Sequence, residues 1–176
     1  MMATTWVLLP VPQEDYDELR HMVDFRQQQR GESSAPSAEE LQGKQLAVNA
    51  ALRAAFDEHK AWPASALARL AASTTATTLR FSQVMDLCSE SPGSVFSTEE
   101  IAERTGMSVN EWRAACRKIG AHLRKHYPDA PHWDREPYIG EPMWPLVNIS
   151  GRRLKVRDQL YVGVTQEQAK RWKSIR

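Results

Sequence analysis

The chain has 176 residues, of which 41% are hydrophobic and 26% are charged, a composition that excludes wholesale disorder. No apolar run approaches the roughly 20 residues that span a bilayer, and two cysteines are too few for a disulfide framework. The net charge of +1 conceals an asymmetry, because residues 1–75 hold 7 basic and 10 acidic side chains whereas residues 76–176 hold 16 and 12. A basic second half permits a local footprint for nucleic acid.

The chain begins with a predicted strand and a predicted helix. The apolar run from Thr4 to Pro10 predicts a buried strand, and it is too short and too poorly flanked for a secretory signal. We therefore expect a cytoplasmic protein with no membrane segment. Apolar side chains at helical spacing predict a helix over Gln13–Gln29, and a polar loop follows over residues 30–36.

A second helix is predicted from Ala38 to about His59, opened by a capping box of Ser37 and Glu40. Its apolar stripe consists of Leu41, Val48, Leu52 and Phe56. The helical pattern leaves two interpretations open. The stripe packs within the monomer, or it forms the interface of a homodimer that reads two half-sites.

Two shorter helices follow. The first is predicted over Ser65–Ala72, and after a polar joint the second runs over Leu79–Glu90 with Phe81 and Cys88 among its inward residues. The sequence Ser91-Pro-Gly ends this helix with turn chemistry.

Two capping boxes in succession predict a helix-turn-helix. Ser97 pairs with Glu100, and Ser108 pairs with Glu111. Gly106 lies between the boxes, where it can take the left-handed conformation that ends the first helix. The second helix therefore begins just after Ser108 and extends to Pro128.

The rest of the chain adds a hairpin and a last helix. The predicted elements are a strand over Trp144–Ile149, a turn at Ser150–Gly151, one or two strands within Arg153–Val164 and a helix over Gln166–Ile175. Thr165 and Gln168 form the capping box of the last helix. We predict a mostly α (α+β) chain: an N-terminal strand and helices over residues 1–75, then a winged helix-turn-helix domain with a β-hairpin wing over residues 76–176.

Residues 79–164 resemble a winged helix-turn-helix domain. The segments that carry the resemblance are Val84-Met-Asp-Leu, Ser91-Pro-Gly, Phe96-Ser-Thr-Glu-Glu-Ile-Ala, Thr105-Gly-Met-Ser and Trp112-Arg, which are similar to those of small bacterial regulators. The ending Gln168-Ala-Lys-Arg-Trp is similar to that of small bacterial winged-helix proteins. The resemblance implies a transcriptional regulator that binds duplex DNA, with the second helix of the motif in the major groove and the wing on the backbone or minor groove.

The residue chemistry supplies separate support for DNA binding. Residues 108–128 hold five Lys and Arg side chains and a single acidic one. Arg can bind guanine through two hydrogen bonds, and Asn can bind adenine in the same way. The candidate DNA-binding residues are Ser108, Asn110, Arg113, Ala114, Arg117 and Lys118 on the helix, and Arg152, Arg153, Lys155 and Arg157 in the wing. The alternative is that the helix face is merely solvated and that the charged hairpin protects a sheet edge from pairing with other chains.

Other side-chain groups allow further chemistry that we consider secondary. His122 and His126 have the i, i+4 spacing of a zinc pair, but no third ligand is spaced to complete a site, so we expect no metal. Cys116 is expected to be a buried structural residue. The chain lacks the short motifs of nucleotide-binding, hydrolase and metalloprotease sites, so we expect neither an enzyme nor a cofactor.

The proline-rich loop holds Trp133, Tyr138 and Trp144. These rings either seal the wing against the helices, stack on an extruded base or bind a partner protein. The last possibility defines the alternative function, a protein-interaction adaptor that uses a winged-helix fold without binding DNA.

Overall fold

The computed structural model describes residues 11–31 and 38–176. The chain divides into two units, Met1–Gln45 and Leu46–Arg176, at an earlier point than the predicted boundary between residues 75 and 76. The predicted strand from Thr4 to Pro10 and the predicted cap Ser37 lie outside the described residues.

The first unit contains the helix expected over Gln13–Gln29. This segment begins as a 3-10 turn, Gln13–Asp15, and continues as α1, Tyr16–Gln29. Acidic side chains occupy the first turn of α1, where they interact favourably with the helix dipole. Helix α2, Ala38–Asp57, begins in the first unit and ends in the second, two residues before the predicted His59.

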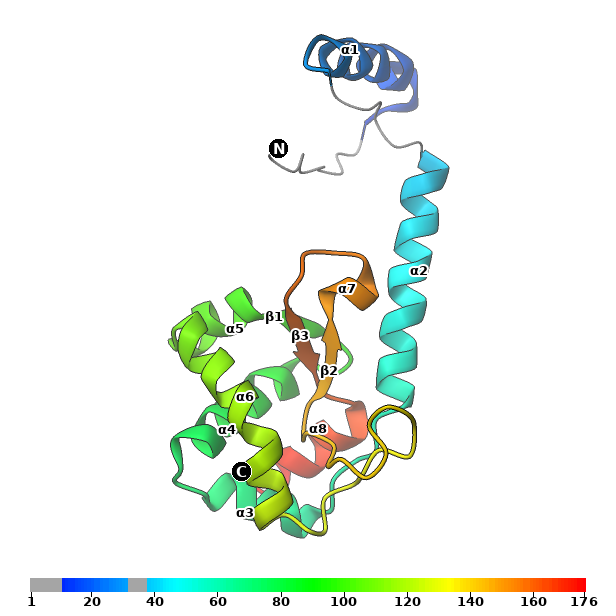
Figure 1. Ribbon diagram of the computed structural model, residues 1–176. Helices are drawn as coiled ribbons and strands as arrows, with labels where there is room; N and C mark the ends of the chain where they lie inside the picture. Colours follow the sequence, from blue (N-terminus) through cyan, green and yellow to red (C-terminus); the bar gives the residue numbers. More distant parts are fainter. Residues whose placement is uncertain (1–10, 32–37) are drawn as a thin grey trace. The chain divides into compact units, whose positions relative to one another are not determined.

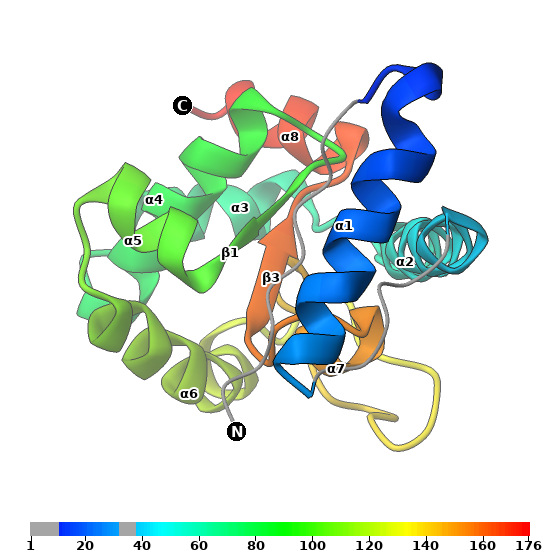
Figure 2. The same cartoon turned by 90° about the horizontal axis from the view of Figure 1, so that it is seen from above.

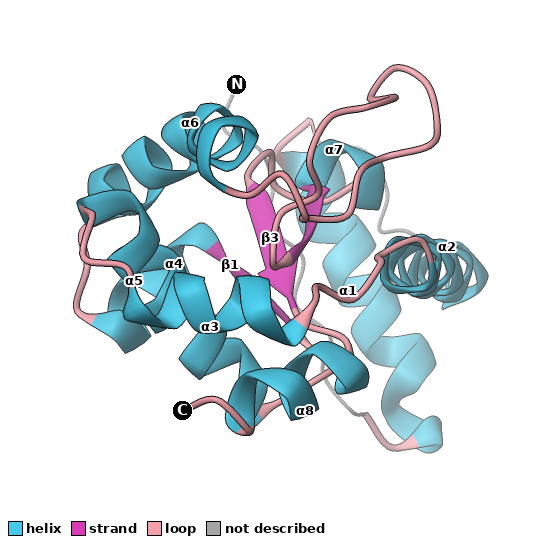
Figure 3. Ribbon diagram, turned by 90° about the horizontal axis from the view of Figure 1, so that it is seen from below, coloured by secondary structure: helices cyan, strands magenta, loops and turns pink. Residues whose placement is uncertain are grey.

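The part of α2 in the second unit covers one face of a small sheet. Val48, Leu52 and Phe56 pack against a cluster of buried apolar residues that includes Val147 and Ile149 of the sheet. These three members of the predicted stripe therefore pack within the chain. Figures 2 and 3 show α2 on one side of the sheet and α4 on the other.

Helix α4, Ala76–Glu90, is central to the second unit (Figure 1). It contacts α3 (Ala64–Ala72), α5 (Thr98–Thr105), α6 (Val109–His126) and α8 (Gln166–Lys173). Phe81, Val84, Met85 and Cys88 are fully buried, and their i, i+3, i+4, i+7 spacing places them on one face of the helix. Three fully buried tryptophans pack in the same core: Trp112 of α6, Trp172 of α8, and Trp62 in the segment before α3.

Helix α4 begins three residues earlier than the predicted Leu79. The Thr75 side chain accepts a hydrogen bond from the Thr78 amide at 3.3 Å, which satisfies one of the first free amides of the helix. The polar joint predicted over residues 73–78 is thus half helical.

Three short antiparallel strands form the sheet. They are β1 (Val95–Ser97), β2 (Val147–Ser150) and β3 (Leu160–Gly163), in the order β1-β3-β2. Strand β1 is not predicted from the sequence, and β2 begins at Val147, three residues after its predicted start at Trp144. Gly163 lies opposite both Val95 and Val147, and a Cβ there would lie 2.3 Å from the Ser94 carbonyl oxygen, so the site requires glycine.

The connection between β2 and β3 corrects the predicted hairpin. Ser150–Gly151 is not a turn between two strands, because Ser150 caps a single helical turn, α7, Gly151–Leu154. The segment predicted as strand from Arg153 is helix and loop as far as residue 159. A Cβ on Gly151 would lie 1.8 Å from the Arg157 carbonyl oxygen, so the connection folds back closely on the start of α7.

Helix α8 begins at its predicted cap and ends at Lys173, two residues before the predicted Ile175. Thr165 accepts from the Gln168 amide as expected, but the Gln168 side chain does not complete the capping box. It is fully buried, accepts from the Trp62 amide at 2.8 Å and donates to the Pro145 carbonyl at 2.9 Å. Gln168 therefore joins α8 to the segments that precede α3 and β2.

The described chain is mostly helical with one small antiparallel sheet, which confirms the predicted α+β class. None of the helices in residues 11–31 and 38–176 combines the length and apolarity of a membrane span.

Candidate nucleic-acid interface

Two capped helices build the candidate interface, as predicted. Ser97 accepts from the Glu100 amide, and the Glu100 carboxylate accepts from the Ser97 amide at 2.7 Å. Gly106 follows with φ of 74°, a conformation that favours glycine. Ser108 and Glu111 repeat the reciprocal box at the start of α6, with the Ser108 amide donating to Glu111 at 2.9 Å. These bonds fix where α6 begins and how it leaves the turn.

Helix α6 has a buried face and a charged face. Trp112, Ala115, Ile119 and Leu123 are buried against the core. On the other face Ser108, Asn110, Arg113, Arg117 and Lys118 are exposed, and Ala114 is half-buried. The helix thus presents its predicted base-reading and phosphate-binding side chains to solvent.

The charges on this face are uncompensated. Within the part of the chain that the structure describes, Arg113, Arg117 and Lys118 form no ion pair. Glu111, the acidic residue of the first turn, is held by Ser108 and by an ion pair with Arg80 of α4 at 2.9 Å. Hydrogen bonds from Ser108 and then the contact with Arg80 lower the pKa of Glu111. Its charge is therefore engaged with Arg80 instead of with the arginines of α6.

The predicted wing cations are different, because most of them already have acidic partners. Arg152 pairs with Asp158 at 2.7 Å, Arg153 with Glu58 at 3.6 Å and Arg157 with Glu99 at 3.3 Å. Lys155 makes no ion pair in the described chain. The four side chains are exposed, but they do not form the unopposed basic cluster that the sequence suggests around Gly151.

A cleft of about 360 Å³ lies between α6 and the start of β3. It is lined by Thr98, Trp112, Arg113, Cys116, Arg117, Asp158, Gln159 and Leu160. The structure thus brings Arg113 and Arg117 beside the end of the β2–β3 connection, whereas Arg152, Arg153, Lys155 and Arg157 do not line the cleft.

Of the eight residues that line this cleft, only Arg113 and Arg117 are predicted from the sequence as binding residues. Trp112 and Cys116 were assigned to the inward face of α6, and Gln159 lay in a stretch predicted as strand. Burial raises the pKa of the Cys116 thiol to about 12, so the thiol stays protonated and neutral at pH 7. No local pattern distinguishes Gln159, because its place depends on how the connection folds back.

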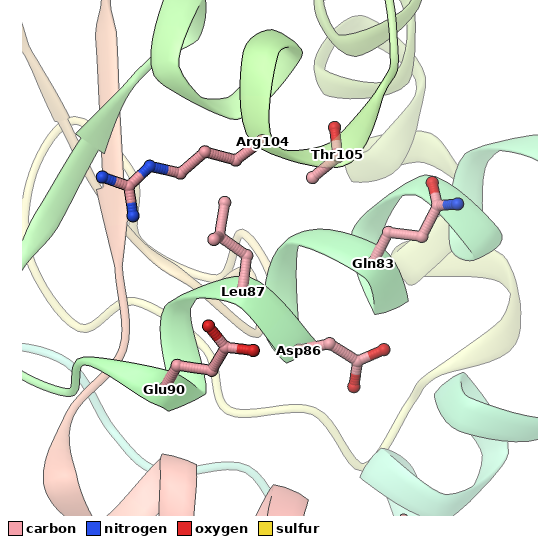
Figure 4. Close-up of a pocket in the computed structure, with 6 residues that line it drawn as sticks. All are labelled: Gln83, Asp86, Leu87, Glu90, Arg104 and Thr105. Carbon is pink, nitrogen blue, oxygen red and sulfur yellow. The ribbon is translucent and has the colours of Figure 1, made fainter.

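A second groove lies between α4 and α5 (Figure 4). Its volume is about 550 Å³, and its lining residues are Gln83, Asp86, Leu87, Glu90, Arg104 and Thr105. Two of its charged groups already serve the fold. Asp86 accepts from the Trp172 indole at 2.7 Å and pairs with Arg176, and the Arg104 guanidinium lies over the Phe96 ring. None of the predicted DNA-binding residues lines this groove.

The remaining candidates occupy other places. The rings of His122 and His126 lie 4.6 Å apart, and burial, with the neighbouring His126 and Lys125, lowers the pKa of His122. Within the described ranges no group of three or more potential ligands surrounds this pair.

The aromatic loop is divided between core and surface. Trp144 meets Phe81 edge to face at 5.5 Å and packs against the core, as the sealing interpretation expects. Tyr138 and Ile139 are 51% and 60% exposed.

Comparisons with known protein families, with curated proteins and with solved structures found no match for this chain.

Proposed function

We propose that this chain is a sequence-specific double-stranded DNA-binding protein of the winged-helix type, acting in transcriptional regulation. The order α4-β1-α5-α6-β2-α7-β3 supports this proposal, since a helix-turn-helix is followed by two strands, β2 and β3, that pair with each other. In this reading α6 enters the major groove, and the β2–β3 connection lies over the backbone or minor groove.

The observation that carries the proposal is the unopposed positive charge on the exposed face of α6. A guanidinium that has no carboxylate partner keeps its five donors for a ligand. Arg113 and Asn110 lie in the first two turns of the helix, where side chains reach base edges. Arg117 and Lys118, further along, suit phosphates.

The β2–β3 connection has a smaller part in this proposal than the sequence suggests. Its arginines exchange an internal carboxylate for a phosphate when they bind, so each contributes little net charge to the contact. Exposed ion pairs are weak, about 0–1 kcal/mol, so the exchange is not blocked. Lys155 is the cation of the connection that needs no exchange.

Binding measured over a range of salt concentrations tests these assignments. Each lost phosphate contact lowers the slope of log affinity against log salt by about 0.9. We expect Arg117→Gln to lower the slope by about this amount on random duplex, and Arg152→Gln, whose native side chain is paired, to lower it by less than half as much.

Sequence readout needs a selected duplex as well as a random one. We expect Arg113→Ala to cost about 1–3 kcal/mol on the selected sequence and much less on random DNA. Arg124→Gln is the matched control, because Arg124 lies near the other end of α6 and pairs with Glu141. No binding to either duplex at low salt would refute the proposal, and equal losses on both duplexes would remove Arg113 from base readout.

A protein-interaction adaptor is the second candidate, favoured by the adjacent exposed side chains Tyr138 and Ile139 on the aromatic loop. An exposed tyrosine beside an aliphatic residue is a suitable anchor for a protein partner. No retention on random duplex or heparin at low salt, together with a partner captured by the native chain and lost with Tyr138→Ala, would favour this function over DNA binding.

A further inference from the structure

Helix α1 exposes a row of large apolar side chains. Leu19 and Met22 are 41% and 45% exposed, and Tyr16 and Val23 are exposed to a similar extent. At 3.6 residues per turn these four side chains fall within about 120° of one face of the helix. A helix of 14 residues is only marginally stable by itself, and a contiguous apolar row on it is typical of an interaction surface. The face therefore calls for a partner.

The charges along α1 are divided between its two ends. Residues 13–19 hold four acidic and no basic side chains, whereas residues 20–30 hold three arginines and one aspartate. Asp15 and Arg26 lie in line with Leu19 and Met22, because the spacing 15, 19, 22, 26 follows the repeat of a packed helix pair. Among the described residues neither Asp15 nor Arg26 has an ion-pair partner. The face is acidic at one end, apolar in the middle and basic at the other end.

This face is complementary to a reversed copy of itself. When two α1 helices pack antiparallel about a two-fold axis between Leu19 and Met22, the Leu19 of each copy meets the Met22 of the other. The same register brings Asp15 of each copy to Arg26 of the other, at both ends of the contact. A parallel pair would instead place the two Asp15 side chains together and the two Arg26 side chains together. The acidic first half also repels an anionic membrane or DNA, so the charges select a second copy of this chain.

We propose that the chain forms a homodimer through antiparallel pairing of two α1 helices. The stripe of α2 does not serve this purpose, because Val48, Leu52 and Phe56 pack within the chain. Helix α1 is about 21 Å long, so the contact is small and the dimer is weak, with a dissociation constant of about 100 μM. A dimer supplies two candidate DNA interfaces to one duplex, which strengthens binding to paired half-sites. The pairing itself does not depend on the proposed function.

Sedimentation equilibrium of the full chain without DNA tests the dimer. We expect a reversible monomer–dimer equilibrium between about 5 and 500 μM. Leu19→Ser should weaken dimerisation at least about tenfold, because it removes an apolar side chain from the centre of the contact. Leu46→Ser is the matched control, since it removes a leucine of α2 that is 63% exposed, and it should change dimerisation less than about twofold.

Exchanging the charges tests the antiparallel orientation. Asp15→Lys and Arg26→Glu each place like charges at both ends of the pair, so each variant alone should dimerise about fivefold more weakly or worse. Mixed in equal amounts, the two variants should associate to within about threefold of the native affinity. In the mixed pair the introduced lysine meets the introduced glutamate, and the native Asp15 meets the native Arg26. Mixing would not restore association if either substitution had merely unfolded α1, and circular dichroism of each variant checks its helix content.

Three results would overturn the inference. A chain that stays monomeric at about 500 μM would show that another part of the same chain covers the face of α1. Equal losses for Leu19→Ser and Leu46→Ser would show that the contact is not made by α1, and a mixture of the charge variants that stays monomeric would exclude the antiparallel pair. A monomer that binds duplex DNA would lose this interface and keep the proposed function, whereas a dimer that binds no duplex would do the reverse.

Discussion

Replacing Gln168 with leucine removes both hydrogen bonds of a fully buried side chain. The amide of Trp62 and the carbonyl of Pro145, held at 2.8 and 2.9 Å, then have no partner. Each orphaned backbone group costs about 1–3 kcal/mol, and the added apolar burial of leucine returns up to about 2 kcal/mol. The two groups together cost about 2–6 kcal/mol and leucine returns at most about 2 kcal/mol, so we expect Gln168→Leu to lower the free energy of unfolding by about 3 kcal/mol, the middle of the resulting range.

Chemical denaturation followed by circular dichroism measures this loss, and a second glutamine of α8 supplies the control. Gln166 is exposed, so Gln166→Leu should change the free energy of unfolding by less than about 0.5 kcal/mol. If the free energy of unfolding of Gln168→Leu is within about 0.5 kcal/mol of the native value, the two hydrogen bonds do not hold α8 in place.

Gln168→Glu tests the same two hydrogen bonds through the pH dependence of stability. A protonated carboxyl can donate to the Pro145 carbonyl and accept from the Trp62 amide, whereas a buried carboxylate cannot donate. Burial raises the pKa of such a carboxyl in the folded state above its unfolded value of about 4.3. The stability of Gln168→Glu should therefore be greatest below pH of about 4.3 and decline as pH rises through the folded pKa, relative to the native chain.

Three further predictions test other regions. Gly151→Ala should lower the thermal midpoint by several degrees, because its Cβ would lie 1.8 Å from the Arg157 carbonyl oxygen, whereas Gly43→Ala in α2 meets nothing within 4 Å and should stabilise by about 0.5–1 kcal/mol. Burial lowers the pKa of His59 below 6.5, so its contribution to stability is present above pH 6.5 and is lost as pH falls through the folded pKa. In His59→Gln the denaturation midpoint should accordingly change less with pH, between about pH 7 and pH 5, than it does in the native chain. Because burial raises the pKa of Cys116 to about 12, iodoacetamide should alkylate the native thiol at about pH 8 far more slowly than the unfolded one.

Each of these predictions has a contrary result. A midpoint for Gly151→Ala equal to the native value would mean that the connection is not packed on α7. Unchanged pH dependence in His59→Gln would assign the acid sensitivity to other groups. Equal alkylation rates in the native and unfolded states would show that Cys116 is open to solvent.

The elements that the sequence predicts well are those set by neighbouring residues. The boxes of Ser97 and Ser108 and the left-handed Gly106 involve partners within three residues, and the structure has all of them. Thr165 shows the limit of such reasoning, because its cap forms while Gln168 turns to distant backbone groups. A local pattern specifies a helix end but not what else a side chain finds in the folded chain.

The features that the sequence does not predict depend on distant segments. Strand β1 has three residues, and its pairing with β3 joins positions more than sixty residues apart, such as Phe96 and Val162. Two acidic partners of the predicted wing cations come from distant segments: Glu58 directly follows α2, and Glu99 lies in α5. Recognising that Arg153 and Arg157 are already paired therefore requires knowledge of the tertiary fold.

The order β1-β3-β2 imposes a sequence of events on a chain made from its N-terminus. Both outer strands leave the ribosome before the middle one, and they do not pair with each other. Until residues 160–163 emerge, β1 and β2 hold unpaired amides and carbonyls that a neighbouring nascent chain can bind. The sheet therefore forms only when the last of its three strands is available, and its assembly is a late step in the folding of this chain.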